Sequence, residues 1–118
     1  MRLFPPDQIT RLTHAVFAAA GWPDEDAAEV ARHFTLANLS GHDSHGIGML
    51  PLYMRSFRDG WLQPGNTPVD KINAPPFLVI DGQLALGQPT ARRAVARAAD
   101  IAAAQGVAIV NLLDAHHI

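Results

Sequence analysis

The sequence of 118 residues lacks cysteine altogether, and lysine occurs only once, as Lys71. Without cysteine the chain can form neither disulfide bonds nor thiolate metal sites, and a reducing cytoplasm, which we expect as its location, is compatible with this. No apolar run approaches the roughly 20 residues that cross a bilayer, so we expect no membrane segment. Residues 14–21 are too short and too interrupted to be the apolar part of a signal peptide.

Charge and composition further limit the kinds of protein that this chain can be. The formal net charge is −2, which gives no indication of a nucleic-acid surface. Hydrophobic residues make up 48% of the chain and charged residues 17%, which is typical of a globular protein and argues against disorder. The length suits one domain of ordinary size and is too short for two.

The first part of the sequence predicts a helical hairpin. Two prolines and Asp7 favour a helix start, and Gly21 favours its end. A second helix is predicted from the acidic residues 24–26 to Gly41. The expected buried stripes are Ile9, Leu12, Val16 and Ala19 in the first helix, and Ala27, Val30, Phe34 and Ala37 in the second.

The rest of the sequence predicts an α/β arrangement. A third helix should begin near Pro51 and end at Gly60, burying Leu50, Met54 and Phe57, and residues 61–76 are expected to be irregular because they contain four prolines. Strands are predicted at residues 77–80 and, of the buried type, at 107–113. A helix over residues 89–105 should join them, with its apolar stripe at Ala91, Ala94, Val95, Ala98, Ile101 and Ala102.

We therefore expect an N-terminal helical segment, residues 1–60, followed by a βαβ-like piece, residues 61–118. Two strands rarely make a stable sheet, so we expect the sheet to contain further strands. The final strand also runs directly into a polar cluster at residues 114–118, whereas domains tend to end in relaxed, solvated sequence. Both observations predict that the sequence is the N-terminal part of a larger protein.

Residues 41–48 (GHDSHGIG) contain the densest group of polar side chains. His42 and His45 could bind a metal with Asp43 or the distant His117. Ser44 could be a nucleophile, although the strand-to-helix frame of such serines is missing. Asp43 or Ser44 could simply cap the following helix. We favour general acid–base chemistry, because a histidine near its ordinary pKa exchanges protons at neutral pH.

The remaining histidines carry less information. A histidine after a strand often only terminates it, which is the simplest interpretation of His116 and, taken alone, of His117. His14 and His33 lie among polar neighbours on predicted helices and are expected to be surface or boundary residues.

Residues 37–53 (ANLSGHDSHGIGMLPLY) resemble the signature of the second type of malate/L-lactate dehydrogenase family, which includes sulfolactate, ureidoglycolate and hydroxycarboxylate dehydrogenases. The resemblance covers essentially the whole chain, corresponds to the first third of a family member and is strongest to the hydroxycarboxylate dehydrogenase B type. The residues that carry it are Ser44-His45-Gly46, Pro51-x-Tyr53, Ile80-Asp81-Gly82, Gly87-Gln88 and the strand leading to His117.

The resemblance implies hydride transfer between NAD or NADP and C2 of a small 2-hydroxy or 2-oxo acid, in a homodimer. It implies a cofactor domain that is not a Rossmann fold, in agreement with the missing glycine-rich fingerprint. By position, His117 and His45 match acid–base or substrate-orienting histidines, with His45 alternatively binding the cofactor, and Ser44 matches a residue of the substrate site. We expect His117 to be the base and no metal to be required.

One position departs from the family pattern. Many members carry arginine where this chain has Met49, and that arginine would suit a substrate carboxylate. Carboxylate recognition is therefore expected elsewhere, including beyond Ile118. Two alternatives stay open: a non-catalytic helical interaction module, and a metal-dependent hydrolase using His42, His45 and His117. The sequence does not choose between NAD and NADP or name the acid.

Overall fold

The computed structural model describes residues 3–117, and the chain divides into two compact units, Met1–Gly65 and Asn66–Ile118. Within residues 3–117, no helix has both the length and the apolar character needed to cross a membrane. The first unit contains α1 (Pro6–Ala19), α2 (Asp24–Leu39), the short 3-10 turns η1 (Asp43–His45) and η2 (Ile47–Met49), and α3 (Leu50–Arg58). The second contains β1 (Val69–Ala74), β2 (Phe77–Asp81), α4 (Gly87–Gln105) and β3 (Ile109–Leu113).

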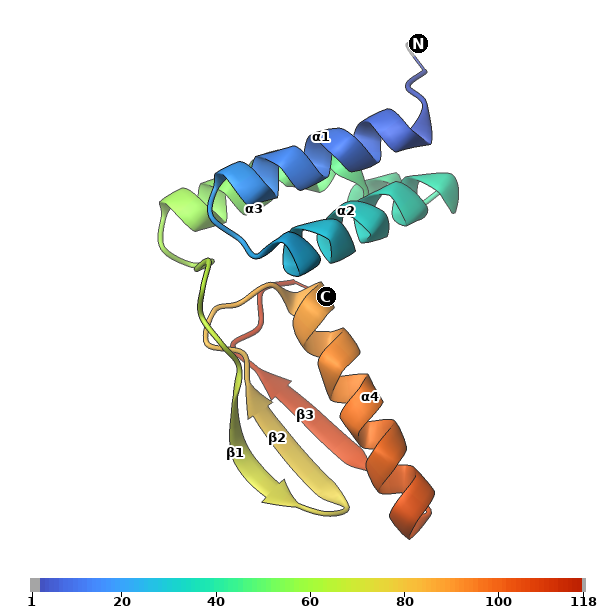
Figure 1. Cartoon of the computed structure of the whole chain (residues 1–118), viewed down its shortest axis with the longest axis vertical. Helices are drawn as coiled ribbons and strands as arrows, with labels where there is room; N and C mark the ends of the chain where they lie inside the picture. Colours follow the sequence, from blue (N-terminus) through green and yellow to red (C-terminus); the bar gives the residue numbers. More distant parts are fainter. Residues whose placement is uncertain (1–2, 118) are drawn as a thin grey trace. The chain divides into compact units, whose positions relative to one another are not determined.

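The predicted helical hairpin is confirmed. Helices α1 and α2 lie side by side and run in opposite directions (Figure 1). Proline occupies the first turn of α1, where its missing N–H leaves no hydrogen bond unmade, and the acidic side chains at the start of α2 complement the positive end of that helix. The chain turns between the helices at Gly21, whose φ of 102° suits glycine.

The core of the first unit is aromatic. Phe17 of α1 packs edge-on against Phe34 of α2 and Tyr53 of α3, with ring centroids 6.3 and 5.9 Å away. Phe34 and Tyr53 are themselves 5.1 Å apart, and Tyr53 is completely buried. Aromatic rings bury much apolar area and favour this edge-to-face geometry, so three rings from three helices hold the unit together.

Two of the predicted stripes of this unit are displaced. Leu12 is 57% exposed, whereas Thr13 and Phe17 are buried, so the buried face of α1 is rotated by one residue. In α3 the fully buried side chain is Tyr53, which sequence spacing had left off the predicted stripe. The prediction for α2 is confirmed at Ala27, Val30 and Phe34, which are all buried.

The second unit is a three-stranded sheet in the order β1-β2-β3. The parallel pairing of β2 with β3 through α4 confirms the predicted βαβ piece. The prediction that residues 61–76 are irregular is wrong, because β1 lies there and pairs antiparallel with β2. All six residues of β1 are exposed, so the strand lacks the buried alternate positions that reveal a strand in a sequence.

Helix α4 covers one face of the sheet (Figure 1). Leu78 and Ile80 of β2 and Ala94 of α4 form its buried core. On the other face, the paired residues Phe77 and Ile109 are 52% and 53% exposed. Strand β3 therefore alternates between exposed and half-buried residues, which corrects the expectation of a buried-type strand. The stripe of α4 is also corrected at Val95, which is 67% exposed.

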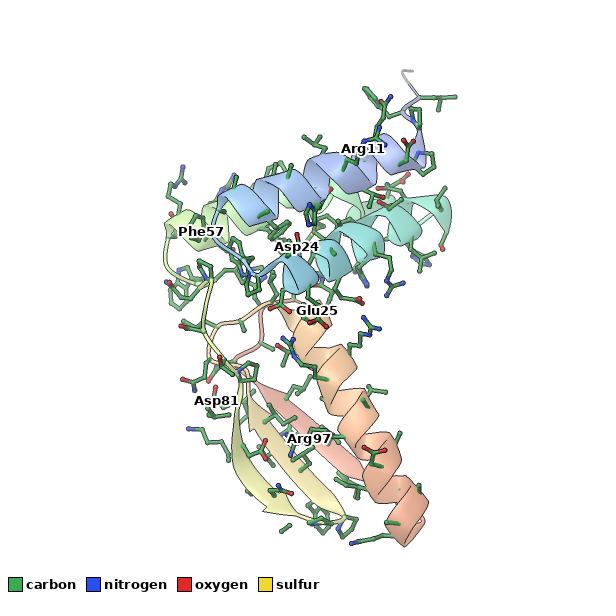
Figure 2. The ribbon with its side chains drawn as sticks, in the orientation of Figure 1. Arg11, Asp24, Glu25, Phe57, Asp81 and Arg97 are labelled. Carbon is green, nitrogen blue, oxygen red and sulfur yellow. The ribbon has the colours of Figure 1, made fainter. Side chains whose placement is uncertain are left out.

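An ion pair joins α4 to the outer strand of the sheet. The two terminal nitrogens of Arg97 donate to the two carboxylate oxygens of Asp70 at 2.6 and 2.7 Å. Figure 2 labels Arg97, on the side of α4 that faces the strands. These hydrogen bonds lower the pKa of Asp70 below its ordinary value. The bidentate geometry fixes α4 against β1 as well as against β2.

Candidate functional site

The polar cluster of residues 41–48 follows a regular helix ending. Gly41 has a φ of 79°, the N–H of Gly41 donates to the carbonyl of Asn38 at 3.1 Å, and the N–H of His42 donates to the carbonyl of Ala37 at 2.8 Å. These paired bonds form the Schellman motif, which closes a helix with glycine in the left-handed conformation. The predicted stop at Gly41 is confirmed, and the motif sets the direction in which the cluster leaves α2.

Ser44 and His45 form a hydrogen-bonded pair in this cluster. Two consecutive 3-10 turns, η1 and η2, carry the backbone through residues 43–49. His42, Asp43, Ser44 and His45 are all exposed. The hydroxyl oxygen of Ser44 lies 2.9 Å from Nδ1 of His45. This contact engages Nδ1 and leaves Nε2 outside the Ser44–His45 hydrogen bond.

The two histidines of the cluster are neighbours without forming a metal site. Their ring centroids are 6.5 Å apart and the rings are perpendicular. Among residues 3–117, no three histidine, aspartate or glutamate side chains gather in a way that could hold a metal ion.

Asn38, a residue to which the sequence assigned no role, connects α2 to both ends of this cluster. Its Nδ2 donates to Oδ1 of Asp43 at 2.6 Å, and its Oδ1 accepts the N–H of Ile47 at 2.8 Å. Gly46 is buried against the same side chain, and a Cβ at that position would overlap the amide of Asn38. The close approach explains the glycine, and an asparagine eight residues before a glycine is too common a pattern to have been noticed in the sequence.

The other candidate, His117, lies in the second unit, on the segment that follows β3. This segment runs beside the connection between β2 and α4. The N–H of Gly82 donates to the carbonyl of Leu113 at 2.6 Å, and the N–H of Gly87 donates to the carbonyl of His116 at 2.8 Å. Residues 113–116 are thereby attached to the N-terminal end of α4, so the position of His117 depends on that helix.

Two glycines make this close approach possible. A Cβ on Gly87 would overlap the carbonyl oxygens of His116 and His117, and a Cβ on Gly82 would lie 2.9 Å from the Cα of Ala115. Real Cβ atoms do not come so close, so any side chain at either position would push the segment away. The sequence showed both glycines, but only the structure shows what approaches them.

His117 itself has a φ of 38°, in the left-handed region that non-glycine residues rarely adopt. Such strained residues cluster at functional sites. Its side chain is exposed, whereas the neighbouring His116 is half-buried. Burial, followed by the proximity of His117, lowers the pKa of His116, which favours its neutral form. Within this pair, His117 is therefore the more accessible imidazole.

The connection after β2 is held by Asp81. Its Oδ1 accepts the N–H of Gln83 at 2.9 Å, and its Oδ2 lies 3.1 Å from Nζ of Lys71. The backbone hydrogen bond from Gln83, with a smaller effect of Lys71, lowers the pKa of Asp81. Asp81 is labelled at the end of β2 in Figure 2. The charged carboxylate thus shapes the turn against which residues 114–117 lie.

The described residues do not offer the phosphate site of a Rossmann fold. In that fold the N–H groups at the start of the helix after a strand bind the pyrophosphate. Here the N–H of Gly87 donates to His116, and Pro89 in the same first turn has no N–H.

Comparison with known proteins shows the family. Residues 4–118 match the malate/L-lactate dehydrogenase family, and the chain belongs to that family. The match agrees with the resemblance that the sequence signature carried, and the solved structures confirm the mixed α/β fold as part of a larger dehydrogenase fold.

Individual relatives agree with this membership. The chain is 39% identical over 115 residues to hydroxycarboxylate dehydrogenase B of Escherichia coli, covering 98% of this chain and 32% of the relative. The structure of sulfolactate dehydrogenase from Methanocaldococcus jannaschii superposes with a TM-score of 0.94 at 34% identity, covering 98% of this chain and 34% of that one. Malate dehydrogenase from Pyrococcus horikoshii gives 0.91 at 29% identity, covering 99% and 33%. The chain thus spans about a third of the length of these relatives.

Proposed function

We propose that this chain belongs to a dehydrogenase that transfers a hydride between NAD or NADP and a small 2-hydroxy or 2-oxo acid, such as malate, lactate or a related hydroxycarboxylate, and that Ser44, His45 and His117 each act in this reaction. The observation that carries the proposal is that the family match extends over residues 4–118 and includes the exposed Ser44–His45 pair. Relatives named for malate, sulfolactate and hydroxycarboxylates support this substrate class.

His117 is proposed as the acid–base residue. Oxidation of a 2-hydroxy acid removes the hydroxyl proton while the C2 hydrogen leaves with its electron pair, so a neutral imidazole must accept the proton. In the reverse direction the protonated ring returns it to the keto oxygen. The exposed side chain of His117, held beside the start of α4 by the bond from Gly87 to His116, suits this role.

Ser44 and His45 are proposed to bind and orient. A serine hydroxyl donates one hydrogen bond and accepts others, so Ser44 can contact a substrate oxygen while it keeps its bond to Nδ1 of His45. Nε2 of His45 would then bind the substrate or the nicotinamide part of the cofactor. When bound, the oxidised nicotinamide supplies the acceptor for the hydride.

Met49 raises the question of how the carboxylate is bound. It is partly exposed at the end of η2 and provides no charge. We propose that the substrate carboxylate is bound by a residue outside this chain or on a partner subunit.

The proposal also covers the cellular location of the enzyme and its binding partners. We propose a reducing cytoplasmic location, with which the absence of cysteine is compatible. The family resemblance supports a homodimer, in which a small-molecule acid, and neither nucleic acid nor membrane, is the binding partner.

The experiment that tests the function is a substrate panel on the purified product of the complete reading frame that contains this sequence. Malate, lactate, sulfolactate and related 2-hydroxy acids are offered with NAD and with NADP, and the corresponding 2-oxo acids with the reduced forms. We expect the absorbance of reduced nicotinamide to change with at least one acid. A folded protein that changes it with no acid in either direction would contradict the proposal.

A further inference from the structure

Asn38 makes three hydrogen bonds with the chain that follows α2. Its main-chain carbonyl accepts the N–H of Gly41 in the helix-ending motif. Its side chain reaches further along, accepting the N–H of Ile47 at 2.8 Å and donating to Oδ1 of Asp43 at 2.6 Å. One residue near the end of a stable helix thus holds three points of the following loop.

Only a side chain with both a donor and an acceptor can make the two side-chain contacts. The N–H of Ile47 requires an oxygen, and the carboxylate of Asp43 requires a donor. A carboxylate at position 38 would still accept the first bond, but it would place two negative charges against each other at the second. The hydrogen bond to a charged acceptor is also the stronger of the two kinds.

The two contacts bracket the residues that matter for the proposed site. Asp43 and Ile47 lie immediately before and shortly after Ser44 and His45, so the tether fixes both ends of a short, exposed segment. Gly46 is buried where the amide of Asn38 lies, and the fit leaves no space for a Cβ. The Ser44–His45 pair thus depends on a helix to which neither residue belongs.

We infer that Asn38 is a positioning residue, which orients the imidazole of His45 by tethering residues 43–47 to α2. This inference rests on the proposed function, since it assigns Asn38 its purpose through His45. It predicts that replacing the amide of Asn38 by a carboxylate breaks the contact with Asp43. Exchanging the amide and the carboxylate between the two positions should restore that contact.

The test exchanges the amide and the carboxylate between positions 38 and 43 in the product of the complete reading frame that contains this sequence, followed by NMR. Asn38→Asp opposes two carboxylates, whereas Asn38→Asp combined with Asp43→Asn restores a donor and an acceptor with exchanged positions. Asp43→Asn alone keeps an oxygen acceptor and is the matched single variant. Two signals are measured: the hydrogen-exchange rate of the Ile47 amide, and the nitrogen shifts of the His45 ring, which report its tautomer.

We expect the repulsion between the two carboxylates in the Asn38→Asp variant to displace residues 43–47. This displacement should raise the exchange rate of the Ile47 amide about tenfold, as a strained and weakened hydrogen bond would, and shift the His45 nitrogens toward those of a free imidazole. The double variant should return both signals toward the wild type. Equal signals in Asn38→Asp and the wild type, or a double variant no better than Asn38→Asp, would overturn the inference.

Gly46→Ala provides a second, independent variant, should Asn38→Asp fail to fold. Its Cβ would displace the amide of Asn38, whereas a Cβ at Gly48 would meet only the carbonyl oxygen of Asp43, at an ordinary 3.7 Å. Gly46→Ala should therefore reproduce both NMR changes and Gly48→Ala should not; equal effects would also overturn the inference. None of these signals needs activity, so an absent tether and an absent dehydrogenase are distinguishable results.

Discussion

The hydroxyl oxygen of Ser44 lies 2.9 Å from Nδ1 of His45, its neighbour in the sequence. Adjacent side chains usually point apart, and the 3-10 turn at Asp43–His45 is what brings these two together. A hydroxyl rotates freely, so it donates to Nδ1 when Nε2 carries the hydrogen, and accepts from Nδ1 when the ring is protonated. The pair can therefore stay bonded while His45 gains or loses a proton.

Removing this bond should affect catalysis more than stability. We expect Ser44→Ala to lower kcat/KM about tenfold, the equivalent of one hydrogen bond, with little change in the unfolding midpoint because Ser44 is exposed. Ser44→Thr keeps the hydroxyl and should retain most of the activity. Steady-state kinetics with the best acid of the panel would measure this; equal losses in both variants would show that the hydroxyl is not the group that acts.

Gly87→Ala should displace the segment that carries His117. The added methyl group would overlap the carbonyl oxygens of His116 and His117, so either the segment or α4 must move. We expect a destabilisation of about 1–3 kcal/mol, as is typical of overpacking, measured by urea unfolding, together with a loss of dehydrogenase activity. Gly48→Ala is the matched control, and an equally small effect of both changes would contradict the packing account.

The Asp70–Arg97 pair should make stability depend on pH at the acidic end. Hydrogen bonds from Arg97 lower the pKa of Asp70, so its stabilising effect is complete above the ordinary aspartate value of about 3.9. As the pH falls below that value and through the lowered pKa, the effect is lost.

Asp70→Asn should therefore unfold at lower urea than the wild type at neutral pH, and the difference should disappear in strong acid. Asp100→Asn, on the same helix as Arg97, is the control. A difference that persists unchanged down to about pH 2, well below the ordinary aspartate pKa, would show that the charge of Asp70 is not its cause.

Metal removal separates the proposed chemistry from the hydrolase alternative based on His42, His45 and His117. The proposed acid–base role of His117 requires no metal, so EDTA treatment followed by dialysis should leave the oxidation of 2-hydroxy acids unchanged. Loss of activity that returns on adding Zn²⁺ would contradict this expectation.

The helices could be predicted from the sequence better than the sheet could. Prolines and glycines mark helix ends by backbone rules that need no partner, which is why Gly41 was identified correctly. Strand β1 is defined by its pairing with β2, and the side chains of β1 do not alternate between buried and exposed positions. The prediction that Leu12 is buried is wrong, because the polar Thr13 beside it is buried in α1 and Leu12 is exposed. Hydrophobicity alone predicts the opposite.

Among the residues of the candidate site, some could be suggested from the sequence and others could not. Ser44, His45 and His117 could be proposed as site residues because a signature of consecutive residues and the polar cluster at residues 114–118 are visible in a single sequence, and their roles stay predictions. Asn38 could not, because its role is a side-chain contact with residues five and nine positions away. Gly87 was visible as a residue, but its reason is the approach of carbonyl groups about thirty residues later. The sequence thus suggested the residues proposed to do chemistry, whereas the contacts of Asn38 and Gly87 are visible only in the structure.

The central claim is that His117 is the acid–base residue of a 2-hydroxyacid dehydrogenase, and the kcat of His117→Ala tests it most directly. His14→Ala is the control, because His14 lies on α1 with its Nε2 2.8 Å from Asp24. We predict that His117→Ala lowers kcat about a hundredfold to ten-thousandfold, the usual contribution of a general base, while His14→Ala leaves it nearly unchanged. Normal turnover in a folded His117→Ala protein would contradict the account.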